Sequence, residues 1–180
     1  MLTITVRGEE VWDMDTEEFS NTFEFVLELE HSLVSLSKWE AIYKKPFISA
    51  DSRTDEETLG YVKAMTLTPN VPPEVYANIS EENQKEIAAY IEDQMTATWF
   101  SDQTKDKKTG EQITAELIYY WMFSAGVDKE CENWHLNRLI TLLRVFSAKN
   151  SPPKKMSQAE IAARNREINA RRRAELKTTG

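Results

Sequence analysis

The first thirty residues alternate apolar and polar side chains with a period of two, which is the pattern of β-strands. Residues 2–6 alternate β-forming side chains. In residues 23–30 one face carries Phe23, Phe25, Leu27 and Leu29, while three glutamates lie on the other. Residues 7–9 are interpreted as a turn, from which residues 10–14 return as a second strand. The pattern predicts a small β element within residues 1–30.

From residue 36 the apolar spacing lengthens to that of helices, and a series of helices is predicted up to residue 148. Ser37 is the expected N-cap of the first helix, and Pro46 ends it. Thr54 and Glu57 form a capping box that opens the next helix. Two prolines at 72 and 73 interrupt the pattern, a short helical turn follows them, and Ser80 starts a further helix that extends to about residue 95.

Two strongly apolar segments are expected at the centre of the fold. Residues 113–125 carry apolar side chains on nearly all sides, which predicts a helix buried on most sides, with Gly126 as its stop. Residues 134–148 form a second helix with Asn133 as its cap. Residues 101–110, in contrast, are polar and aperiodic and predict an exposed loop. The core is expected to include three large side chains from the two helices: Trp121, Leu139 and Leu143.

The C-terminal segment has a different character. Residues 149–156 contain a double proline and predict a linker, and Ser157 with Glu160 forms a second capping box that opens a helix to about Leu176. This helix has few apolar residues. The i,i+4 ion pairs Glu160–Arg164 and Glu167–Arg171 are expected to stabilise it. The fold class is therefore mainly α with a small N-terminal β element (α+β). Residues 1–148 form an acidic globular body, 149–156 a linker and 157–180 a basic helical arm.

Charge divides the chain in the same place. The formal charge of −8 combines +6 in residues 149–180 with −14 in residues 1–148, and residues 9–30 alone contain nine acidic side chains and no basic one. An acidic body with a basic arm can dock the arm on the body, self-associate, or hold two unlike partners. The acidic body argues against extensive nucleic-acid binding.

Cysteine content and hydropathy indicate a cytosolic protein. The single cysteine, Cys131, excludes an internal disulfide framework and fits a reducing compartment. The N-terminal segment lacks the basic and apolar regions of a signal peptide, and no apolar stretch is long enough to span a membrane. We expect the protein in the cytosol, which for a viral protein is that of the host.

The chain offers little for catalysis or for a cofactor. Its only histidines are His31 and His135. Cys131 and His135 could share a helix face, but two ligands do not make a structural zinc site. His31 and Ser32 are adjacent on a predicted strand and point to opposite faces, so they do not form a nucleophile–base pair. With five isolated glycines there is no glycine-rich phosphate loop. We expect no enzyme activity, no metal and no cofactor.

Candidate binding residues lie in the arm. Arg171, Arg172 and Arg173 are consecutive on a weakly amphipathic helix, and together they point around more than half of its circumference. Three interpretations remain open for them: a solvated tail, a protein-docking segment, or a nucleic-acid contact. With Arg164 they are the predicted partner-binding residues.

Short motifs along most of the chain resemble, in the same order, the tail assembly chaperones of long-tailed bacteriophages of actinobacterial and related hosts. These motifs occupy residues 29–40, 45–47, 65–67, 71–76, 95–100, 118–122, 133–139 and 152–156, the last leading to 163–166. None of them has a known catalytic meaning.

The resemblance implies a non-catalytic chaperone in the host cytoplasm. Such a protein binds the tape measure protein, contacts other tail proteins, promotes assembly of the tail tube, and is expected to be absent from the mature virion. Covering exposed apolar surface of the tape measure protein by mass action would suppress its aggregation. The alternatives are a phage virion structural protein of the tail or head–tail region, and a nucleic-acid-binding regulator. A virion protein would persist in purified particles, and a regulator would bind DNA with strong salt dependence.

Overall fold

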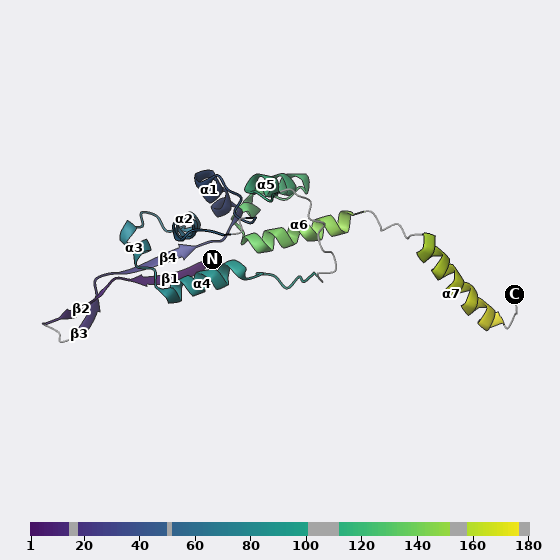
Figure 1. The fold of residues 1–180 in the computed structure, drawn as a ribbon, viewed down its shortest axis with the longest axis horizontal. Helices are drawn as coiled ribbons and strands as arrows, with labels where there is room; N and C mark the ends of the chain where they lie inside the picture. The colour runs from purple at the N-terminus through teal and green to yellow at the C-terminus, as the bar shows by residue number, and fades with distance from the viewer. Residues whose placement is uncertain (15–17, 50–51, 101–111, 152–157, 177–180) are drawn as a thin grey trace. The chain divides into compact units, whose positions relative to one another are not determined.

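The computed structural model describes the chain except for residues 15–17, 50–51, 101–111, 152–157 and 177–180 (Figure 1). It is mostly helical with a small antiparallel β element at the N-terminus, which confirms the predicted fold class. The chain divides into two compact units, Met1–Ser147 and Ala148–Gly180. The expected loop at 101–110 and most of the expected linker lie outside the described residues.

The β element is one long hairpin. Strand β1 (Leu2–Arg7) pairs antiparallel with β4 (Glu24–Leu29), and β2 (Glu10–Asp13) pairs with β3 (Glu18–Asn21) in the same unbroken register. The outermost described pair of the hairpin is Asp13 with Glu18. The prediction of a turn at residues 7–9 is wrong: Gly8 donates its N–H to Phe23 O at 2.9 Å, which continues the pairing.

Gly8 is required where the hairpin passes from one strand pair to the next. A Cβ at this position would lie 2.1 Å from Thr22 Oγ1 and 2.7 Å from the Phe23 ring. The sequence suggested a turn because glycine is common in turns, whereas here it permits close approach of the opposite strand.

Helices α1 and α2 follow the hairpin. Helix α1 (Leu33–Tyr43) begins one turn earlier than predicted, because Ser32 and Ser35 form a reciprocal capping box; Ser37 is not the cap. Helix α2 (Asp55–Met65) begins at the predicted capping box of Thr54 and Glu57. After α2, the backbone pairs briefly with β4 through Leu67 N–H to Glu28 O at 2.8 Å.

The next two helices are close to expectation. The short helix α3 (Pro73–Ala77) starts with proline at its first position, where the missing N–H costs nothing. Helix α4 (Glu81–Glu92) is capped by Ser80 as predicted, and it ends before the expected residue 95.

The last elements of the first unit are α5 (Ala115–Ser124), the 3₁₀ helix η1 (Lys129–Asn133) and α6 (Leu136–Asn150). Gly126 adopts φ 68° just beyond α5, so the predicted stop is confirmed. Asn133 does not cap α6; it closes η1, and its side-chain amide donates to Glu130 O at 3.4 Å.

The core lies between one face of β1–β4 and helices α1, α2, α4, α5 and α6. Leu139 and Leu143 are buried in it, as predicted. Trp121 is only partly buried at its edge, so its prediction as a full core residue is corrected. The fully buried tryptophan is Trp39, whose Nε1–H donates to Glu57 O at 2.8 Å.

Glu40 connects α1 to α5 inside this unit. Its buried carboxylate accepts the N–H of Phe47 on one oxygen and the N–H of Ala115 on the other, both at 2.8 Å. Ala115 is the first residue of α5, where backbone N–H groups have no partner within the helix. A single carboxylate therefore sets where α5 begins relative to α1.

Candidate partner-binding surfaces

The four arginines predicted to bind a partner lie on α7 (Gln158–Leu176), the helix of the second unit. Every α7 side chain that the structure describes is exposed, Arg164, Arg171, Arg172 and Arg173 among them. The predicted helix is confirmed. Its Ser157 cap lies outside the described residues.

Helical geometry divides these arginines between faces. Arg164 and Arg171 are seven residues apart and fall within about 20° of each other, whereas Arg171 to Arg173 spread over about 200°. Arg172 lies near the line of Ile161 and Ile168, which are both partly solvent-accessible. One flat surface can thus engage Arg164 and Arg171 together, but not all three consecutive arginines.

The ion pairing of Arg171 differs from expectation. Its Nε lies 3.2 Å from Glu175 Oε1, with both side chains largely exposed, in place of the expected pair with Glu167. An exposed pair of this kind contributes little to stability, because water and salt screen it. The guanidinium remains accessible to a partner that offers a stronger contact.

A second exposed surface lies on α5 and consists of Tyr119, Tyr120 and Phe123; we call it the aromatic face. Tyr120 is 66% exposed and Phe123 60% exposed. The rings of Tyr119 and Phe123 stack with centroids 6.2 Å apart, and the Tyr119 hydroxyl donates to Glu132 Oε2 at 2.9 Å. Large aromatic side chains left in water are typical of binding surfaces.

The aromatic face corrects the prediction that residues 113–125 are buried on most sides. The fully buried side chains of α5 are Ala115, Ile118 and Met122, while Tyr119 and Trp121 pack on the core partly buried. The all-round apolar pattern by itself predicts burial within the fold. In the first unit, part of that apolar surface instead faces solvent.

The two histidines meet in the interior, although 104 positions separate them in the sequence. Their rings lie 5.0 Å apart and both are buried. His31 Nδ1 is 2.6 Å from the Tyr61 hydroxyl, and His135 Nε2 is 2.9 Å from Tyr90 O. Leu136 N–H also donates to His31 O at 2.7 Å, so the pair joins the end of β4 to the start of α6.

Burial determines how His31 of the histidine pair binds protons. Burial lowers the pKa of His31 from 6.5 to about 3, with smaller contributions from the nearby His135 and Arg53. A base of that pKa is neutral and weak at physiological pH. The hollow nearest to it, at the start of α1, is lined by Ser32 and Ser35 and by neither histidine. No spacing rule in the sequence could have paired the two residues.

In the part of the chain that the structure describes, no group of three or more His, Cys, Asp or Glu side chains could hold a metal ion. No helix within the described ranges is long and apolar enough to cross a membrane. Cys131 is a partly buried free thiol.

The chain matches no protein-family model, no curated protein and no solved structure. The surfaces on α5 and α7 are therefore interpreted from their own chemistry, together with the short motifs of the sequence.

Proposed function

We propose that this protein is a tail assembly chaperone of a long-tailed bacteriophage, which binds the tape measure protein and promotes assembly of the tail tube without catalysis. In this proposal it acts in the host cytoplasm and leaves before the virion is complete. The observation that carries the proposal is that α7 is a basic helix whose described side chains are all at least partly exposed to solvent.

The composition of α7 supports a role in binding rather than in folding. An isolated helix is only marginally stable in water, and most helices in proteins are stabilised by packing an apolar face. A helix with few apolar residues has little such face to pack within its own chain. Ile161, Ile168 and Leu176 supply a narrow apolar stripe, and the arginines beside it supply charge. Contact with a partner would bury the stripe and add charged hydrogen bonds.

The aromatic face of α5 supports the same proposal. A tape measure protein exposes long apolar helical surfaces before the tube encloses it, as the resemblance implies. Tyr120 and Phe123 offer apolar contact area with little loss of side-chain freedom. A chaperone that covers such surfaces lowers the concentration of aggregation-prone chains by mass action.

The proposal is tested by recovering the tagged protein from phage-infected cells and asking whether the tape measure protein co-purifies. We expect co-purification with the wild type. We expect it to be reduced by Tyr120→Ser with Phe123→Ser, and by changing Arg171, Arg172 and Arg173 to Glu. Matched controls are Val26→Ser, at an exposed apolar position of β4, and the three arginines changed to Lys, which keeps their charge.

Two outcomes would contradict the proposal. One is the absence of tape measure protein from the wild-type complex. The other is recovery of the protein in stoichiometric amounts from purified virions by mass spectrometry, which would identify a virion structural protein. DNA co-purification that depends on the three arginines and falls steeply with salt would indicate a nucleic-acid-binding regulator.

A further inference from the structure

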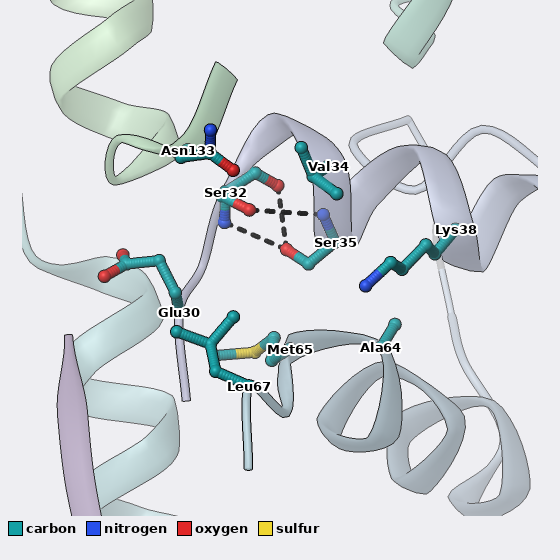
Figure 2. A pocket seen from close by; sticks show the side chains of 9 residues that line it. All are labelled: Glu30, Ser32, Val34, Ser35, Lys38, Ala64, Met65, Leu67 and Asn133. Atoms are coloured by element: carbon teal, nitrogen blue, oxygen red, sulfur yellow. Dashed lines mark hydrogen bonds between the residues drawn. The ribbon is translucent and has the colours of Figure 1, made fainter. Parts of the chain in front are cut away.

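A furrow runs between α1 and α2, on a part of the first unit that neither proposed surface includes. Two adjoining hollows form it, one of 140 Å³ near the start of α1 (Figure 2) and one of 470 Å³ towards its end. Lys38 of α1 and Ala64 of α2 line both hollows, so the two lie next to each other. From Val34 to Ile42 the α1 wall extends about 12 Å, the length of two helical turns.

The furrow has an apolar surface with exposed side chains at its ends. Ile42 is 68% exposed at one end, and Leu67 is 52% exposed at the other. Between them the lining includes the small residues Ala41, Gly60 and Ala64. The Tyr43 ring covers Gly60, so the room for apolar groups of a third element lies at Ala41 and Ala64.

Two lysines stand on opposite walls of the furrow. Lys38 projects from α1 towards Ala64 (Figure 2), and Lys63 belongs to the last turn of α2. Both side chains are exposed, and within the described ranges neither forms an ion pair. The Lys63 ammonium lies 5.4 Å from the centre of the Tyr76 ring.

The acidic groups around the furrow are already engaged elsewhere. The Glu30 carboxylate, at the Leu67 end, accepts the Tyr90 hydroxyl at 2.7 Å and is turned away from Lys38 (Figure 2). Glu57 bonds to Lys45, whose ammonium holds the pKa of that carboxyl below its usual range. Lys38 and Lys63 are therefore two accessible cations beside an apolar furrow, in a body whose net charge is −14.

We propose that the α1–α2 furrow binds a short acidic amphipathic helix of a partner protein, whose apolar side chains enter between the two helices and whose carboxylates pair with Lys38 and Lys63. The dimensions fit a helix-in-groove contact, which uses apolar residues at positions i, i+3 or i+4, and i+7. This inference goes beyond the proposed function and does not depend on the phage assignment, because it stands on the chemistry of the furrow.

The test measures binding of a synthetic probe to the full chain. The probe is a fluorescent 14-residue helical peptide with leucines at positions i, i+4 and i+7 and flanking glutamates, and the matched probe has lysine at every glutamate. We expect anisotropy titrations to show tighter binding of the acidic probe. Its affinity should fall as sodium chloride rises, because exposed ion pairs are screened.

Variants locate the contact. Lys38→Glu with Lys63→Glu should weaken binding of the acidic probe about tenfold, because two favourable charge pairs become repulsive. Ile42→Asp should abolish binding, and Ala41→Trp should block the furrow. Lys85→Glu, at an exposed position of α4, is the matched control and should leave the affinity unchanged. Thermal melts of each variant establish that the fold is intact.

Three results of the peptide titrations would overturn the inference: no binding of the acidic probe, equal binding of the lysine probe, or full affinity in the double charge reversal. A sedimentation result would overturn it as well: a concentration-dependent change that Ile42→Asp removes would make the furrow an interface between copies of this chain. Each can occur whether or not the tape measure protein co-purifies, so the two proposals fail separately.

Discussion

At the scale of single residues, the interior is organised by a few buried polar groups that bond to one another. His31 and Tyr61 bond through their side chains, and Ser32 and Ser35 cap the helix that follows. His135 Nδ1 is buried without a hydrogen-bond partner among the described residues. An unpaired buried polar atom costs free energy and is tolerated where the surrounding packing holds it in place. These groups make the first unit sensitive to pH and to single substitutions.

The first prediction concerns acid. Because the pKa of His31 is about 3 in the folded protein and 6.5 in the unfolded chain, only the unfolded chain binds this proton between those values. The free energy of unfolding is therefore highest above pH 6.5, where His31 is neutral in both states, and it decreases as the pH falls below that value. The slope for one proton is at most about 1.4 kcal/mol per pH unit. Urea unfolding between pH 7 and 5 should show this loss.

The control for this prediction is His31→Gln, which removes the titrating group. It should be less stable than the wild type at pH 7 and should show a shallower dependence on pH across the same range. Equal slopes for the two proteins would mean that His31 is not responsible. The range stops at pH 5 because carboxylates titrate below it.

The second prediction compares three tryptophans. Trp39→Ala removes a fully buried ring and leaves Glu57 O without its donor, and it should destabilise by ~3–5 kcal/mol. Trp121→Ala should cost about 1–2 kcal/mol, because that ring is only partly buried. Trp99 is 74% exposed, and its replacement by Ala should change stability by less than about 0.5 kcal/mol. Denaturation midpoints that do not follow this order would refute the burial ranking.

At the scale of elements, long-range hydrogen bonds decide how the helices are placed. The hairpin of β1 to β4 provides one apolar face, and the Leu136 N–H bond to His31 O holds the start of α6 at its end. The Glu40 carboxylate likewise accepts the N–H of Ala115 and so holds the start of α5. In each case a backbone group at the end of a helix, which has no partner within the helix, is satisfied by a residue distant in the sequence.

The third prediction tests the link through Glu40. Glu40→Ala leaves the N–H groups of Phe47 and Ala115 without an acceptor, at ~1–3 kcal/mol each. Amide hydrogen exchange should then accelerate in the first turn of α5 more than in α4. Glu86→Ala, at an exposed position of α4, is the control and should have little effect. Unchanged exchange in α5 would mean that Glu40 does not determine its position.

At the scale of the whole molecule, two units of opposite charge are joined in one chain. Residues 1–148 sum to −14 and residues 149–180 to +6. The described side chains of α7 are all exposed, and α7 carries few apolar residues. Stability and partner binding are therefore expected to be separable.

The fourth prediction follows from that separation. Truncation after Asn150 should change stability by ~1 kcal/mol or less, as for changes away from the core. It should nevertheless weaken assembly with the partner, and changing Arg171, Arg172 and Arg173 to Glu should have the same effect through loss of salt-sensitive contacts. The truncated protein is assayed by thermal melting and by support of tail formation. A large fall in melting temperature, or normal tail assembly, would contradict the prediction.

Much of the secondary structure could be predicted from the sequence, because its causes are local. The Thr54–Glu57 capping box, the Ser80 cap, the Gly126 stop and the existence of α7 each depend on residues within a few positions of one another. The errors have a common reason. Each of Gly8, Ser37 and Asn133 suits its predicted role by its local sequence. In the structure, however, Gly8 bonds to Phe23 of the opposite strand, Ser32 caps α1, and Asn133 closes η1.

The fold class, several helix ends and the opposite charges of the body and arm could be predicted from the sequence, because period, capping and charge are properties of neighbouring residues. Which apolar faces are covered depends on the tertiary structure. It buries Trp39, leaves Tyr120 and Phe123 in solvent, and brings His31 and His135 together. The physical reason is that burial depends on the packing of elements far apart in the chain, and a local pattern shows that a face is apolar but not what covers it.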